Sequence, residues 1–135
     1  MDKARLKAIP LFANLDDHDL QVIATFADET SVSEGDVLVR EGDFSYELMA
    51  IEEGEAEVHK GGETVATLGP GDFFGEVALL DGGPRTATVT AATPVKLIGI
   101  TGWVFRGLLM EHPAIALKTL EAVAGRLRQV SKEPV

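Results

Sequence analysis

Residues 71–87 have the sequence GDFFGEVALLDGGPRTA, which contains the densest group of structural signals in the chain. Gly75 permits a backbone angle that other residues avoid, and the run 76–80 that follows it predicts a short helix. A helix that begins at a glycine presents free backbone N–H groups and the positive end of its dipole. These features favour a bound anion, so we expect a small anionic ligand near residue 75.

A single arginine returns to this short helix. The Gly-Gly-Pro turn at 82–84 breaks the helix and directs Arg85 back towards its start. Arg85 is the only lysine or arginine between Lys60 and Lys96, and its planar fork suits two phosphate oxygens. Glu76 beside an anion is explained if its carboxylate accepts a hydrogen bond from a hydroxyl of the same ligand. A sugar phosphate supplies both groups.

The chain around this segment, from about residue 30 to residue 100, predicts β-structure. Glycine-containing turns recur there and separate short runs of Val, Ile, Leu and Thr, which is typical of a sandwich or barrel. Residues 55–59 alternate between acidic and apolar side chains, and residues 86–91 also alternate. One face of the sheet is therefore expected to contact solvent.

Helices are predicted before the strands. A short helix at about 2–8 precedes a second helix, which Asp16 or Asp17 can cap and which runs to Ala27. The acidic residues Asp16, Asp17 and Asp19 are expected to form a solvated first turn that the helix dipole stabilises.

Helices are also predicted after the strands. Thr101 is expected to cap a helix over 102–111, and Pro113 opens a last helix. Trp103 and Phe105 are expected to be buried. The last helix carries an apolar stripe made of Leu117, Leu120, Ala124 and Leu127. We expect the stripe to pack on the barrel, and pairing with a second subunit is the alternative, so the chain is a monomer or a weak homodimer.

The composition excludes several classes of partner. The chain has 22 acidic against 12 basic residues and a net charge of −10; residues 1–112 carry 20 acidic and 8 basic side chains, and residues 113–135 carry 2 and 4. Such an acidic surface argues against binding to nucleic acid or to a membrane. The chain has no cysteine, and its first residues do not resemble a signal peptide, so a cytoplasmic protein is expected.

The residues do not indicate metal or catalytic chemistry. The three histidines, His18, His59 and His112, lie far apart in the sequence, and none has the spacing of a metal-binding pair. A cupin-like metal enzyme, the nearest catalytic alternative, would need clustered His and Glu. The sequence has no nucleophile elbow, Walker-type phosphate loop or dinucleotide-binding turn. We therefore expect no cofactor, no metal and no enzymatic activity.

Residues 74–87 resemble the phosphate-binding cassette of the cyclic nucleotide-binding domain family. The matching parts are FGEVALL at 74–80 and, after four residues, RTA at 85–87. The resemblance extends to REGD at 40–43 and EEGEAEV at 52–58. It implies an α+β fold in which helices flank an antiparallel, jelly-roll-like β-roll. The implied layout is one domain over 1–135, with N-terminal helices at 1–28, the β-roll at 29–100, and hinge and lid helices at 101–132.

The same resemblance implies the role of each site residue. Glu76 would bind a ribose 2′-hydroxyl and Arg85 the cyclic phosphate, while Thr86 adds a hydroxyl. Gly75 and Ala78 would offer backbone N–H groups. The other residues implied to line the ligand site are Phe74, Val77 and Ala87 and, near the base on the lid helix, Leu127 and Arg128.

The implied function is that of a non-catalytic sensor. The ligand is a 3′,5′-cyclic nucleotide, with cAMP as first choice and cGMP left open by Thr86. Binding would move the C-terminal helix and so relay a signal to a downstream protein that the sequence does not identify. The alternative is a ligand-free protein interaction module that has kept the fold, in which Arg85 forms a structural ion pair with Asp72 or Asp81.

Overall fold

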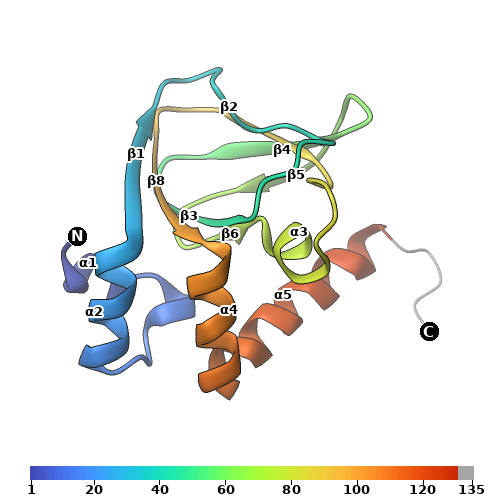
Figure 1. Cartoon of the computed structure of the whole chain (residues 1–135). Helices are drawn as coiled ribbons and strands as arrows, with labels where there is room; N and C mark the ends of the chain where they lie inside the picture. Colours follow the sequence, from blue (N-terminus) through green and yellow to red (C-terminus); the bar gives the residue numbers. More distant parts are fainter. Residues whose placement is uncertain (131–135) are drawn as a thin grey trace.

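The computed structural model describes residues 1–130 and places a β-roll over a layer of helices (Figure 1). The roll consists of two four-stranded sheets in which every neighbouring pair is antiparallel; their strand orders are β1-β8-β3-β6 and β2-β7-β4-β5. The strands are β1 (Ala27–Val32), β2 (Val37–Val39), β3 (Glu47–Glu53), β4 (Ala56–Lys60), β5 (Glu63–Leu68), β6 (Phe73–Phe74), β7 (Thr88–Ala91) and β8 (Val95–Thr101). The predicted α+β fold with an antiparallel roll is confirmed.

The helices lie where the sequence predicts them, before and after the strands, with one short helix inside the roll segment. They are α1 (Lys3–Lys7), the 3₁₀ turn η1 (Pro10–Phe12), α2 (Asp17–Phe26), α3 (Glu76–Asp81), α4 (Gly102–Glu111) and α5 (Pro113–Val130). In Figure 1, α5 runs below the roll and passes α3, against which it packs. Within residues 1–130, no helix is both long enough and apolar enough to cross a membrane.

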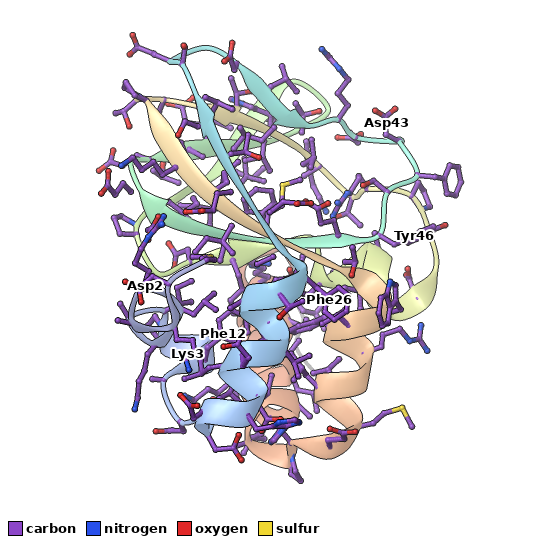
Figure 2. The ribbon with its side chains drawn as sticks, turned by 60° about the vertical axis from the view of Figure 1, so that its left-hand side comes forward. Asp2, Lys3, Phe12, Phe26, Asp43 and Tyr46 are labelled. Atoms are coloured by element: carbon purple, nitrogen blue, oxygen red, sulfur yellow. The ribbon has the colours of Figure 1, made fainter. Side chains whose placement is uncertain are left out.

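The apolar core has two parts. The lower part lies between the roll and the helices, where Phe12 and Phe105 pack with Leu48, Ile98 and Ile100 of β3 and β8; all five are fully buried. Figure 2 shows Phe12 among the helices of this layer. The upper part fills the roll itself and includes Ile51, Phe74 and Val89. Phe74 therefore fixes the start of the 74–87 segment to the inside of the roll.

Residues at the start of α4 differ in part from the prediction. Phe105 is buried as expected, whereas Trp103 is 68% exposed and packs edge to face on Phe26, with 5.2 Å between ring centroids. Thr101 stands at the N-cap position of α4, but its hydroxyl makes no capping hydrogen bond. Trp103 is exposed because α4 has one buried face, which Val104, Phe105 and Leu108 already fill.

The predicted packing of the leucine stripe on the roll is wrong. Leu117, Leu120 and Leu127 are 58%, 59% and 62% exposed. The buried face of α5 instead carries Ile115 and Thr119, and Thr119 remains buried because its hydroxyl donates to the Ile115 carbonyl at 2.9 Å. The hydrophobic stripe therefore lies on the outer side of α5.

The first turn of α2 is only partly solvated. Asp16 caps the helix as predicted, since its Oδ1 accepts a hydrogen bond from the Asp19 backbone at 2.9 Å. Asp17 pairs with Lys3 at the surface. Asp19, however, is buried, with Oδ2 at 2.8 Å from Nε2 of His112. The expectation of a fully solvated acidic turn is therefore wrong for Asp19.

Candidate ligand site

The segment 74–87 forms a strand end, a short helix and a return loop. Gly75 follows β6 with φ +96° and begins α3, and Gly82 ends α3 with φ +72°. Both angles lie in the left-handed region that favours glycine. Ala78 and Leu79 are 2% exposed, so α3 is held against the protein by its apolar face.

The return loop places Arg85 beside Gly75. Its backbone N–H donates to the Asp43 carbonyl at 2.8 Å, and its carbonyl accepts from the Gly42 N–H at 2.9 Å. These bonds fix the loop to the segment that joins β2 and β3, on which Figure 2 labels Asp43 and Tyr46. Tyr46 holds the other end of the loop, because its hydroxyl donates to the Gly82 carbonyl at 2.9 Å.

The Arg85 side chain is 97% buried and faces the end of β3. Nη2 donates to Ser45 Oγ at 3.1 Å and to the Glu47 carbonyl at 2.9 Å. Nε and Nη1 are buried too, and neither has a hydrogen-bond partner within residues 1–130. A buried donor without an acceptor costs about 1–3 kcal/mol, so this geometry favours an anionic acceptor.

Arg85 does not form the ion pair with Asp72 or Asp81 that was expected for a ligand-free interaction module. Asp72 instead accepts from the Gly69 N–H at 2.8 Å, and Asp81 accepts from the Gly83 N–H at 2.8 Å. Burial lowers the pKa of the Arg85 guanidinium below its ordinary value, while the charges of Glu47 and Glu76 raise it. The guanidinium nevertheless remains cationic at neutral pH.

Gly75 makes room for Arg85. A Cβ atom at residue 75 would stand 2.3 Å from Arg85 Nη1 and 2.6 Å from the Glu47 carbonyl oxygen. The positive φ and this close approach together require glycine. The glycine thus positions the guanidinium as well as the start of α3.

Glu76 is the second buried ionisable group of the site and is 1% exposed. Its Oε1 accepts a hydrogen bond from Arg126 of α5, whose other terminal nitrogen donates to the Phe73 carbonyl. The Arg126 guanidinium also lies over the Phe73 ring, 5.5 Å from its centroid. Glu76 Oε2 is buried and has no hydrogen-bond partner in the described part of the chain. One oxygen therefore fastens α5, and the other suits a hydroxyl donor.

Some of the predicted site residues lie close together in the structure, and others are exposed to solvent. Gly75, Glu76 and Arg85 lie together, next to buried Phe74 and Ala78. Val77 and Ala87 are half-buried, whereas Thr86, Leu127 and Arg128 are exposed. Sequence reasoning did not identify Ser45, the Glu47 carbonyl or Arg126. Only Arg126 has a periodic signal, since it follows Ile115 and Thr119 on one face of α5.

The class of protein follows from the β-roll together with Gly75, Glu76 and Arg85. Residues 29–112 match the family described as the cyclic nucleotide-binding domain. The chain belongs to this family. Its domains are non-catalytic binding modules.

The relatives include regulatory proteins from several organisms. A cAMP-dependent protein kinase regulatory subunit of Yarrowia lipolytica is 43% identical over 94 residues, which cover 68% of this chain and 25% of the relative. The chain thus matches about a quarter of that relative's length, and the relative is a larger protein.

Solved structures show the same arrangement. The regulatory domain of Toxoplasma gondii PKA, crystallised with cAMP, is 25% identical to this chain and has a TM-score of 0.79. The match covers 90% of this chain and 48% of that one. The N-terminal domain of a transcriptional regulator from Streptomyces coelicolor is 35% identical with a TM-score of 0.68; the match covers 100% of this chain and 99% of that one. These proteins support the assignment to the family.

Proposed function

We propose that this chain is a sensor domain that binds a 3′,5′-cyclic nucleotide, with cAMP preferred and cGMP as the second ligand, and that it performs no catalysis. The observation that carries the proposal is the pairing of two buried groups in one cassette. Arg85 keeps buried donors that suit a phosphate, and Glu76 keeps a buried acceptor oxygen that suits the ribose 2′-hydroxyl. The relatives named above, a cAMP-dependent regulatory subunit and a domain crystallised with cAMP, support the choice of cAMP.

The charges of the site fit a cyclic phosphate. Arg126 compensates the carboxylate of Glu76, so the Arg85 charge remains for the ligand. One positive charge then meets the single negative charge of a cyclic phosphodiester. Thr86, which is exposed next to Arg85, adds a hydroxyl to the same anion in our proposal.

We expect Glu76→Gln to reduce discrimination by the 2′-hydroxyl. A hydrogen bond to a charged group is worth about 1.5–3 kcal/mol and a neutral one about 0.5–1.5 kcal/mol. The wild-type protein should therefore bind cAMP about 10- to 100-fold more tightly than 2′-deoxy-cAMP, while the variant should show a ratio below about tenfold. Calorimetric titration of both proteins with both nucleotides measures the two ratios. If the wild-type protein and the variant show the same ratio of affinities for cAMP and 2′-deoxy-cAMP, Glu76 does not contact the ribose hydroxyl.

The relay that we propose runs through α5. Arg126 ties the C-terminal part of α5 to Glu76 and to the Phe73 carbonyl, so a ligand that engages Glu76 acts on the same carboxylate that holds the helix. A ligand can shift the balance between two arrangements of α5 only if it contacts them differently. The base contact expected from Leu127 or Arg128 stays a prediction, and the exposed side chains of both residues would have to turn inward to make it.

We expect cAMP to slow amide exchange in α5 and Arg126→Gln to diminish this protection. Residues 113–130 should exchange more slowly with ligand in the wild-type protein, because a ligand hydroxyl on Glu76 Oε2 would fix the carboxylate that Arg126 binds through Oε1. Residues 17–26 of α2 serve as an internal control, since they lie outside the cassette. Hydrogen exchange with mass spectrometry measures both segments. Identical exchange of α5 with and without saturating cAMP would contradict the relay.

A further inference from the structure

A second cluster of polar side chains lies at the opposite end of α5, where α4 and α5 join beside the start of α2. It consists of Asp19 on α2, Glu111 at the end of α4 and His112 at the junction. One carboxylate oxygen or ring nitrogen from each residue lies within 4.8 Å of the other two. The linear spacing of the histidines did not indicate this cluster, because Asp19 is 93 positions away from His112 in the sequence.

The His112 ring nitrogen does not point at the Asp19 oxygen beside it, which leaves its direction open to a metal ion. Nε2 of His112 is buried and lies 2.8 Å from Oδ2 of Asp19, yet it has no hydrogen-bond partner among residues 1–130, so the oxygen lies off the N–H direction. Two donors about 2.0–2.1 Å from a tetrahedral zinc ion are about 3.3–3.4 Å apart. Oδ2 would therefore move about 0.5 Å away from Nε2 to share the ion.

The charge of the cluster suits a divalent cation. Asp19 has a side chain that is 9% exposed, and within residues 1–130 neither it nor Glu111 forms an ion pair with a lysine or arginine. The nearest acidic groups are already engaged, since Asp16 caps α2 and Asp17 pairs with Lys3. Lys118, which lines the neighbouring cavity with His112, donates to the Pro10 carbonyl at 2.9 Å. Asp19 and Glu111 therefore bring two carboxylates to the cluster, and no lysine or arginine of residues 1–130 pairs with either of them.

The backbone holds His112 rigidly in this position. Its N–H donates to the Leu108 carbonyl at 2.8 Å and so ends α4, and its carbonyl accepts from Ile115 at 3.0 Å in the first turn of α5. A ligand that is fixed before binding loses little entropy when the metal arrives. Glu111 is exposed and has a long side chain that can close on the ion.

We propose that Asp19, Glu111 and His112 bind one divalent transition metal, with zinc the best match to a nitrogen and two oxygens and with water completing the coordination. The ion would join α2 to the α4–α5 junction. This proposal is independent of nucleotide binding, because it uses none of the residues of the cassette.

The test is titration of the EDTA-treated full chain with zinc chloride, without nucleotide. We expect one zinc per chain, at least about tenfold weaker binding in His112→Asn and Glu111→Gln, and unchanged binding in His59→Asn. His59 is a matched control, since its Nε2 also lies near a carboxylate, 3.7 Å from Glu57. Glu111 is exposed, so its variant should fold, and circular dichroism verifies this for all three. Failure of the wild-type protein to bind zinc, or equal affinity in the folded Glu111→Gln and His112→Asn variants, would overturn the proposal.

Cobalt(II) gives a second readout of the same site. The wild-type protein should develop visible d–d absorption bands with cobalt, which excess zinc should abolish, and its thermal midpoint should rise with zinc because the metal binds only the folded chain. Neither change is expected in His112→Asn. Visible bands that survive in that variant would place the metal elsewhere.

Discussion

Replacing Arg85 by alanine should weaken cAMP binding by about 2–5 kcal/mol, roughly 30- to 5,000-fold, because a phosphate in the cassette loses its buried counter-charge. Arg85→Lys should recover only part of this loss, since an ammonium keeps the charge without the planar fork that also holds Ser45 and the Glu47 carbonyl. Calorimetric or fluorescence titration with cAMP measures both variants.

The control for this prediction is Arg40→Ala. Arg40 is an exposed arginine at the start of the segment that joins β2 and β3, so Arg40→Ala changes the net charge by the same amount as Arg85→Ala without removing a cassette residue. Thermal unfolding of each variant separates lost binding from lost folding, because Arg85 is buried. An Arg85→Ala protein that is folded and binds cAMP as tightly as the wild type would refute the phosphate contact.

Gly75→Ala should lower both stability and cAMP affinity. A non-glycine residue in the left-handed region costs about 1–2 kcal/mol, and the new Cβ would also displace either the Arg85 guanidinium or the Glu47 carbonyl. We expect the unfolding free energy to fall by more than that backbone cost and binding to weaken by about tenfold or more. Chemical unfolding and nucleotide titration measure the two effects.

Gly82→Ala is a matched control for Gly75→Ala. Gly82 has φ +72°, and a Cβ added there would meet no atom of residues 1–130 within 4 Å, so Gly82→Ala shares the backbone cost without the contact with Arg85. This variant should lose stability but keep its affinity for cAMP. If both variants lose affinity equally, the close approach of Gly75 to Arg85 has no role in binding.

Much of the fold and the centre of the site could be predicted from the sequence, because each depends on local chemistry. Alternating side chains and glycine turns indicate the strands whatever their partners are. Gly75 and Arg85 stand out for similar reasons, since Gly75 starts a helix and Arg85 is the only lysine or arginine between Lys60 and Lys96.

The errors concern choices that tertiary contacts make. Helix α5 packs against α3 and η1, and its buried side chains are Ile115 and Thr119 rather than the leucines. Hydrophobicity alone predicted that the leucine face would be buried. Arg126 was missed because it does not lie on that face. Asp19 looked solvated because only the folded chain brings His112 beside it.

Direct titration of the wild-type chain with cAMP and with cGMP in a calorimeter is the most direct test of the proposed function. We predict saturable binding of one cyclic nucleotide per chain, tighter for cAMP, together with a higher thermal midpoint in its presence. No saturable heat and no thermal shift with either nucleotide would contradict the sensor function. Such a result would favour the interaction module that has kept the fold without the ligand.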